Sequence, residues 1–179
     1  VGSEMCIRDR VRFTFVALAL LMAGVLLIPP VATEAKTAET RVEARHSKRC
    51  LDVRGKSKSD GAIVQQYKCK KKGPNQRWHL APAGGGYYYF VNKNSGKCLD
   101  IKAASTASRA YAQQYTCKGG DNQKFKLVTA RSGGWYNIVA KHSGLCLDVK
   151  SSGRGDRAIV QQYDCKNTSN QQWRLRVPK

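Results

Sequence analysis

Short apolar runs separated by polar and glycine-rich stretches make up most of the chain after residue 41. Aromatic and β-branched residues fill residues 87–91 and 135–139, and each of these runs follows a glycine turn. Runs of this kind, bounded by glycine and polar clusters, are typical of β-strands. No helical periodicity appears after residue 35, so the pattern predicts an all-β domain.

The same order of residues occurs three times at intervals of 48 residues. Each copy opens with Cys-Leu-Asp-Val or Cys-Leu-Asp-Ile, continues to Gln-Gln-Tyr-x-Cys, and closes with Asn-Gln-x-Trp or Asn-Gln-x-Phe. The copies occupy approximately residues 41–80, 81–127 and 128–177, with about four short strands in each. Strands this short must share one core. A propeller typically needs four to eight blades, so three copies predict a β-trefoil with a pseudo-threefold axis.

Alternation within each repeat predicts which side chains are buried. In the first repeat Leu51 and Val53 flank Asp52, so the aspartate faces away from its apolar neighbours. Equivalent positions near the end of the repeats hold three aromatic residues, Trp78, Phe125 and Trp173. We expect these rings to form the shared core rather than ligand contacts.

Six of the seven cysteines lie in the repeats, as three pairs whose members are 19 residues apart. This regularity predicts one disulfide per repeat, in the pairs Cys50–Cys69, Cys98–Cys117 and Cys146–Cys165. A zinc site is the alternative, although zinc motifs use shorter cysteine spacings. Each disulfide would stabilise the fold by roughly 3 kcal/mol through loop entropy and would imply an oxidising compartment.

The first 35 residues resemble a leader. Arg8, Arg10 and Arg12 precede an apolar run over residues 13–28, and small residues follow at 33–35. This order is typical of a secretory signal peptide, and a membrane anchor is the alternative. We therefore expect a leader at 1–35, a short flexible lead at 36–40 and a folded domain at 41–179, in a secreted, extracellular protein.

The net charge of the chain is +20, and the first repeat is its most basic part. The basic residues of that repeat are Lys48, Arg49, Arg54, Lys56, Lys58, Lys68, Lys70, Lys71, Lys72 and Arg77. Such a surface can bind sulfated glycans, acidic cell-wall polymer or nucleic acid through counterion release. A well-solvated surface without a partner is the simpler interpretation of the same charge.

The threefold set of Cys-Leu-Asp-Val, Gln-x-Tyr-x-Cys and Asn-Gln-x-Trp motifs resembles the ricin B-chain lectin family. The resemblance covers about residues 41–177. It includes the carbohydrate-binding modules of many secreted glycoside hydrolases. The family resemblance implies a β-trefoil with up to one shallow sugar pocket per repeat.

The resemblance also implies which residues bind sugar. In the first repeat they are Asp52, Gln65, Tyr67, Asn75 and Gln76. In the second they are Asp100, Gln113, Tyr115, Asn122 and Gln123. In the third they are Asp148, Gln161, Tyr163, Asn170 and Gln171.

The sequence departs from the family pattern at three places. Phe125 replaces tryptophan, and Lys48 stands where glycine precedes the first cysteine in the other repeats. The segment at 70–74 is one residue longer than its counterparts, a difference that can displace Asn75.

These residue types suit a pyranose independently of the resemblance. A carboxylate accepts hydroxyl protons strongly, amides both donate and accept, and tyrosine offers a flat apolar face with a polar tip. The alternative is that the polar residues only tie turns together, and it applies above all to the glutamine after each asparagine.

We expect no enzyme activity, because glycoside cleavage needs two carboxyl groups close together and the repeated aspartates fall one per repeat. His46 and His142 occupy matching turns, where a turn role is the simpler interpretation. We expect no cofactor, no metal and no specific nucleic acid. The expected partner of a monomeric protein is a galactose-, xylose- or mannose-type glycan, and a targeting module separated from a glycoside hydrolase is a further alternative.

Overall fold

The computed structural model describes residues 39–177 of the 179-residue chain. The leader predicted at 1–35 lies outside the described residues, so the signal peptide and the domain boundaries stay predictions. Within residues 39–177 no helix is long and apolar enough to cross a membrane.

Twelve β-strands and six short 3-10 turns form the described domain, four strands and two turns in each repeat. The first repeat contains β1 (Arg41–Ala44), β2 (Cys50–Val53), β3 (Val64–Tyr67) and β4 (Trp78–Pro82). The second contains β5 (Tyr87–Asn92), β6 (Cys98–Ile101), β7 (Ala112–Tyr115) and β8 (Phe125–Arg131). The third contains β9 (Trp135–Ala140), β10 (Cys146–Val149), β11 (Val160–Tyr163) and β12 (Gln172–Arg176). The predicted all-β class and the four strands per repeat are confirmed.

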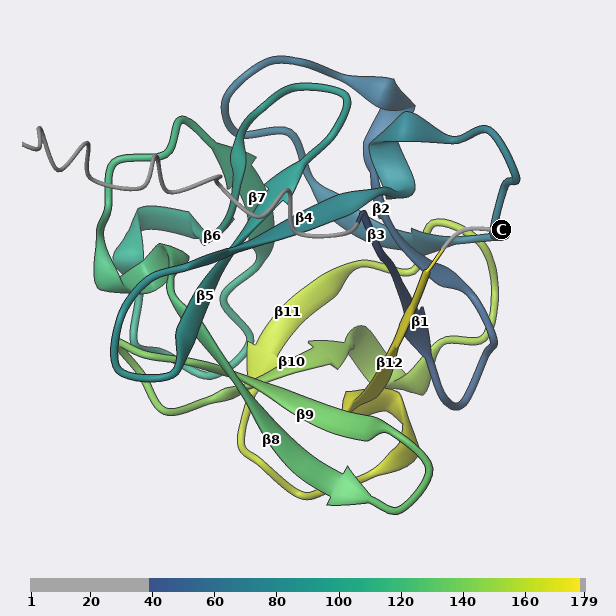
Figure 1. Cartoon of the computed structure of the whole chain (residues 1–179). Helices are drawn as coiled ribbons and strands as arrows, with labels where there is room; N and C mark the ends of the chain where they lie inside the picture. Colours follow the sequence, from purple (N-terminus) through teal and green to yellow (C-terminus); the bar gives the residue numbers. More distant parts are fainter. Residues whose placement is uncertain (1–38, 178–179) are drawn as a thin grey trace, which may run out of the picture. The chain divides into compact units, whose positions relative to one another are not determined.

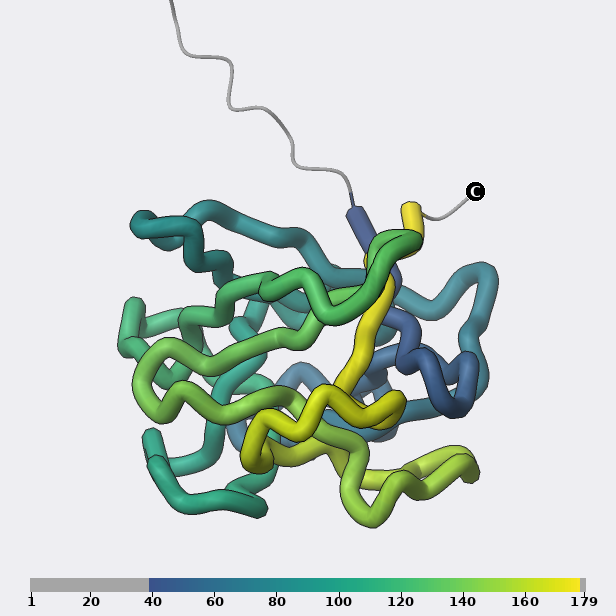
Figure 2. The backbone as a smooth tube through the Cα atoms, turned by 90° about the horizontal axis from the view of Figure 1, so that it is seen from below, coloured from purple at the N-terminus to yellow at the C-terminus, as the bar shows by residue number. Residues whose placement is uncertain are grey.

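Six of the strands close into a ring. Antiparallel pairing joins β1 to β12, β12 to β9, β9 to β8, β8 to β5 and β5 to β4. Thr40 and Trp78 then exchange two backbone hydrogen bonds of 2.8 Å, which connects β4 back to β1. In Figure 2 the first and last strands, purple β1 and yellow β12, lie side by side.

The remaining strands form three hairpins, one in each repeat: β2–β3, β6–β7 and β10–β11. Single β-bridges join each hairpin to the next, at Ile63–Gln113, Tyr111–Gln161 and Gln65–Ile159. In Figure 1 the colours pass around the domain in sequence order, so each repeat has the other two as neighbours. This arrangement of a six-stranded ring and three hairpins is the predicted β-trefoil.

One hydrophobic core lies between the ring and the hairpins, and Trp78, Phe125 and Trp173 are fully buried in it. The indole nitrogens of the two tryptophans donate to the carbonyl oxygens of Leu51 and Leu147, at 3.1 and 3.0 Å. Phe125 has no such donor and packs edge-to-face on Phe90, with ring centroids 5.9 Å apart. The predicted core role of the three aromatic residues is confirmed.

Three disulfides join the predicted pairs, Cys50–Cys69, Cys98–Cys117 and Cys146–Cys165, each with a Cα–Cα distance of 5.1 Å. The zinc alternative is therefore wrong for these six cysteines. Within residues 39–177 no group of His, Cys, Asp and Glu is arranged to hold a metal ion.

Candidate functional site

The three repeated aspartates lie at the third position of β2, β6 and β10, each directly across from the first glutamine of the neighbouring strand. Because these strands are buried on both faces, Asp52, Asp100 and Asp148 are only 3–4% exposed. Their carboxylates face away from the apolar core, as the alternation predicted. A carboxylate at such depth needs hydrogen-bond donors.

Amide groups of the same repeat provide these donors. In the first repeat Gln65 donates to one oxygen of Asp52 at 2.9 Å, while Asn75 and Gln76 donate to the other at 2.8 and 2.9 Å. The second repeat repeats this pattern around Asp100, with Gln113, Asn122 and Gln123 at 2.8, 2.8 and 3.0 Å. In the third repeat Gln161 and Asn170 donate to Asp148 at 3.0 and 2.7 Å.

Burial raises the pKa of Asp52, Asp100 and Asp148 above the ordinary value of 3.8, and the amide hydrogen bonds oppose part of this rise. Since each oxygen of an ionised carboxylate can accept about two hydrogen bonds, the oxygen facing the first glutamine keeps an acceptor direction free. In the first two repeats the other oxygen already accepts two hydrogen bonds, so the oxygen facing the glutamine is the one with room for a further donor.

The asparagines are positioned by short 3-10 turns that begin near the end of each repeat, η2 (Pro74–Gln76), η4 (Asp121–Gln123) and η6 (Ser169–Gln171). Each asparagine also donates to the backbone carbonyl that follows the aspartate, at 2.9–3.1 Å. The longer segment at 70–74 leaves Asn75 in the same place as its counterparts. The displacement that the sequence left open does not occur.

The glutamines that follow the asparagines lie behind the aspartates and tie a turn together. Gln76, Gln123 and Gln171 each donate to one backbone carbonyl and accept from one backbone amide of the segment after the third strand, at 2.8–3.0 Å. They are at most 2% exposed. This geometry favours the turn-supporting alternative for these three residues.

The tyrosines Tyr67, Tyr115 and Tyr163 are half-buried at the rims of the three sites. A lysine three residues further along the chain places its ammonium over each ring. The distances from the nitrogen of Lys70, Lys118 and Lys166 to the ring centroids are 4.9, 5.2 and 5.4 Å. Each tyrosine therefore presents its ring next to a positive charge.

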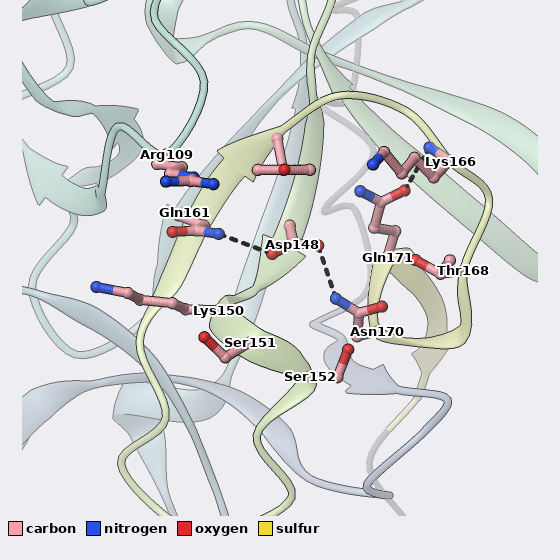
Figure 3. A pocket seen from close by; sticks show the side chains of 11 residues that line it. Arg109, Asp148, Lys150, Ser151, Ser152, Gln161, Lys166, Thr168, Asn170 and Gln171 are labelled. Carbon is pink, nitrogen blue, oxygen red and sulfur yellow. Dashed lines mark hydrogen bonds between the residues drawn. The ribbon is translucent and has the colours of Figure 1, made fainter.

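Open pockets lie beside all three aspartates. Those of the first and third repeats have volumes of about 530 Å³, and that of the second has about 320 Å³. Aspartate, first glutamine, tyrosine and asparagine line every one of them. Figure 3 shows the third pocket, where Gln161 and Asn170 approach Asp148 from opposite sides.

Two buried oxygens in these pockets have no hydrogen-bond donor among the described residues, Asn75 Oδ1 and Gln161 Oε1. A buried acceptor without a partner is unfavourable, and a ligand hydroxyl can supply the missing donor. Both oxygens belong to residues that the sequence identified as candidates.

Sequence reasoning missed two features around the pockets. The second glutamine of each Gln-Gln-Tyr motif is fully buried and binds the neighbouring repeat. Arginines of neighbouring repeats, Arg157 and Arg109, line the first and third pockets. The second glutamine recurs in all three repeats and the arginine in two of them, but the sequence does not show which repeat these side chains contact.

Comparison with known proteins agrees with the β-trefoil fold. A family model described as a ricin-type beta-trefoil lectin domain-like family matches residues 30–115, 74–163 and 121–179, which together cover most of the chain. The chain belongs to the ricin-type β-trefoil lectin-like family. No curated protein matches it.

Solved structures of other proteins share the fold. The designed threefold-symmetric protein ThreeFoil is 47% identical, with a TM-score of 0.74 over 76% of this chain and 96% of its own. The exo-beta-1,3-galactanase 1,3Gal43A from Clostridium thermocellum is 32% identical, with a TM-score of 0.77 over 80% of this chain. This chain spans only 31% of the galactanase. The agglutinin of Rhizoctonia solani, at 22% identity and a TM-score of 0.70 over 80% of this chain and 96% of its own, supports the fold alone.

Proposed function

We propose that the protein is a secreted lectin domain with up to three shallow sugar pockets. The observation that carries this proposal is the threefold recurrence of one polar arrangement. A buried aspartate, a glutamine and an asparagine line an open pocket next to a half-buried tyrosine. Membership of a lectin-like family supports a carbohydrate-binding role. We propose that the aspartate, glutamine, asparagine and tyrosine of each repeat are the residues that bind the sugar.

The geometry suits a pyranose chemically. The free acceptor direction of each aspartate accepts a hydrogen bond from a ring hydroxyl, and so does the unpartnered oxygen of Asn75 in the first pocket and of Gln161 in the third. The tyrosine ring gives the C–H face of the sugar an apolar contact. Few contacts in an open pocket correspond to weak binding, about 0.1–1 mM or roughly −4 to −5.5 kcal/mol for one site.

A binding role is favoured over hydrolysis. Each of the three pockets has one aspartate in its lining and no second carboxyl group among the described residues. Glycoside hydrolysis needs a pair of carboxyl groups roughly 5–10 Å apart. The proposed function is therefore to bind glycans without cleaving them.

Three disulfides suit an extracellular location, since reducing compartments rarely preserve them. Galactose-type glycans are our first choice of ligand, because the similar galactanase acts on a galactan. Xylose- and mannose-type glycans follow, and a monomer suffices for all three sites.

A second candidate function is a targeting module for a catalytic domain. The observation that favours it is the galactanase comparison, in which a segment of this size belongs to a larger enzyme. In that case the three pockets would hold the polysaccharide close to the catalytic domain. The proposed sugar-binding chemistry is the same in both candidates.

A glycan array with three matched proteins tests the sugar pockets. We expect the wild type to bind neutral glycans, and the triple variant Tyr67→Ala, Tyr115→Ala, Tyr163→Ala to lose binding at least tenfold. The tyrosine substitutions leave the buried aspartate networks in place, which protects the fold. The triple Tyr→Phe variant is the control, because it keeps the rings and should retain most binding. Normal binding by the folded triple alanine variant would refute the proposed pockets.

A further inference from the structure

The three pockets differ at the position where a neighbouring repeat reaches into them. The equivalent residues are Gly61, Arg109 and Arg157, spaced 48 residues apart. Each donates its backbone amide to the carbonyl of the second glutamine of the next repeat, at 2.8–2.9 Å. The same backbone contact therefore places Gly61 beside the second pocket, Arg109 in the third and Arg157 in the first.

All three residues have a left-handed backbone, with φ angles of 77°, 73° and 68°. This conformation suits glycine and strains any residue with a Cβ atom. Gly61 has the residue type that the backbone prefers, whereas the other two repeats have an arginine there. Two of the three repeats therefore have a long cationic side chain on a backbone that favours glycine.

The third pocket is positively charged. Arg109, Lys150 and Lys166 line it together with a single carboxylate, that of Asp148. In Figure 3 Arg109 lies above Gln161, and Lys150 is on the same side of Asp148, whereas Lys166 lies on the opposite side. Arg109 and Lys150 would therefore both attract an anionic group bound on the Gln161 side of this pocket.

The first pocket has the same character and the second does not. Arg54, Lys56, Lys70 and Arg157 line the first pocket against the single carboxylate of Asp52. In the second pocket the only charged lining residues within the described part of the chain are Lys118 and Asp100. The lining charges therefore give +3 and +2 for the first and third pockets and zero for the second.

The two cross-repeat guanidinium groups are not used by the fold. Within residues 39–177 neither Arg109 nor Arg157 forms an ion pair or a side-chain hydrogen bond, and Arg109 only approaches the Tyr163 ring at 5.8 Å. By comparison, Arg54 in the first pocket donates to Gln65 at 2.9 Å. Arginine has five donors in a planar fork that matches a carboxylate.

We infer that the first and third pockets select a saccharide that bears a carboxylate, such as a uronic acid, while the second pocket takes a neutral sugar. This inference rests on the proposed sugar-binding function and specifies its ligand class. The ring hydroxyls bind the aspartate and the amides, and the sugar carboxylate pairs with Arg109 or Arg157. The neighbouring repeat thus sets the specificity of each pocket.

Calorimetry with a galacturonic acid trisaccharide and its methyl ester tests the inference, because esterification removes the carboxylate charges and leaves the ring hydroxyls unchanged. We expect the wild type to bind the acid roughly tenfold more tightly than the ester, as for one charge-assisted contact. The Arg109→Gly, Arg157→Gly variant should lose this preference and still bind the ester. Glycine suits the left-handed backbone, so the variant should fold.

The reciprocal variant Gly61→Arg should create a third site that prefers the acid. The control variant Lys58→Ala, Arg131→Ala removes two exposed charges outside the three pockets and should keep the preference. A preference that survives both arginine substitutions, or that disappears in the control, would overturn the inference.

Equal binding of acid and ester, or no binding of either, would also overturn it. A galactose 6-sulfate probe that binds more tightly than the uronate would assign the arginines to sulfate instead. In each of these cases the neutral-glycan array with the tyrosine variants still decides the proposed function separately.

Discussion

Each repeated aspartate has two roles, because its carboxylate both holds its own repeat together and faces a pocket. Asp52 receives three amide hydrogen bonds from residues 13–24 positions away, and at 3% exposure it is shielded from water. The cost of burying the charge explains why its pKa is raised in spite of these donors. Substitution of this residue therefore perturbs the fold as well as the pocket, and the rim tyrosine is the cleaner probe.

Acidification should weaken sugar binding at a pH above 3.8, the ordinary pKa of aspartate. Burial raises the pKa of Asp52, Asp100 and Asp148, so these carboxyl groups take up protons earlier than exposed ones as pH falls. A protonated carboxyl is a weaker acceptor for sugar hydroxyls. Titration calorimetry with a neutral glycan from pH 7 to pH 4 measures this loss.

The fold should survive the same acidification. A raised pKa in the folded state means that these aspartates stabilise the fold most when protonated, and that this contribution is lost as pH rises through the raised pKa. The exposed Asp60, Asp121 and Asp156 have lowered pKa values, so their stabilising contribution is lost only below 3.8. Circular dichroism on the same samples is the control. Affinity that stays constant until the protein unfolds would contradict this account.

At the scale of elements, the second glutamine of each third strand fastens one repeat to the next. Gln114 donates to the carbonyl oxygens of Ser57 and Ser59 at 2.9 Å and accepts from Ser95 at 2.7 Å. Gln66 and Gln162 donate in the same way to two carbonyl oxygens of the third and second repeats, respectively. Each also accepts from a serine of its own repeat, Ser47 or Ser143. The three glutamines form a closed cycle of contacts. The loops at residues 57–59, 105–107 and 153–155 are each held by a glutamine of another repeat.

Removal of one of these glutamines should destabilise the whole domain. Gln114→Ala leaves two carbonyl groups and a serine hydroxyl without their partner and opens a cavity, which should lower the free energy of unfolding by about 2–4 kcal/mol. Ser95→Ala keeps both contacts of Gln114 to the first repeat and removes only the Ser95 hydroxyl, which donates to Gln114 and accepts from the Lys97 amide, so it should cost less, about 1–2 kcal/mol. Urea unfolding of both variants makes the comparison. Equal, small losses would mean that the glutamine does not fasten the repeats.

Much of this arrangement was predictable because it is encoded locally and repeated. The strand runs, the disulfide spacing and the aspartate and asparagine of each repeat lie within one 48-residue unit. The roles of Gln114 and Arg109 were not predictable in the same way, because they depend on which repeat lies beside which. The packing of Phe90 on Phe125 is a further example. Phe125 is smaller than the tryptophan of the other two repeats, and Phe90 is larger than its equivalents there, Val42 and Ile138.

At the scale of the whole molecule, the charge and the pockets overlap. Lys70 belongs to the basic first repeat, yet its ammonium lies over the Tyr67 ring and lines the first pocket. Charge reversal at Lys70 would therefore change sugar binding as well as attraction to polyanions. Lys71 and Lys72, which are exposed and lie outside the three sugar pockets, separate the two effects.

Three pockets on one rigid domain should bind a multivalent glycan far more tightly than a single sugar. The three disulfides and the cycle of glutamine contacts fix the pockets relative to one another, so after one sugar binds, the others meet their sites at a high effective concentration. Loss of one pocket should therefore matter more for a polymer than for a monosaccharide.

We expect the single variant Tyr163→Ala to reduce affinity for a glycan-coated surface severalfold or more, while monosaccharide affinity per remaining site stays unchanged. Surface plasmon resonance at low and high glycan density, with calorimetry on the free sugar, measures both quantities. If Tyr163→Ala keeps the wild-type ratio of affinities for dense and sparse surfaces, the third pocket adds nothing to multivalent binding and the three sites do not act together.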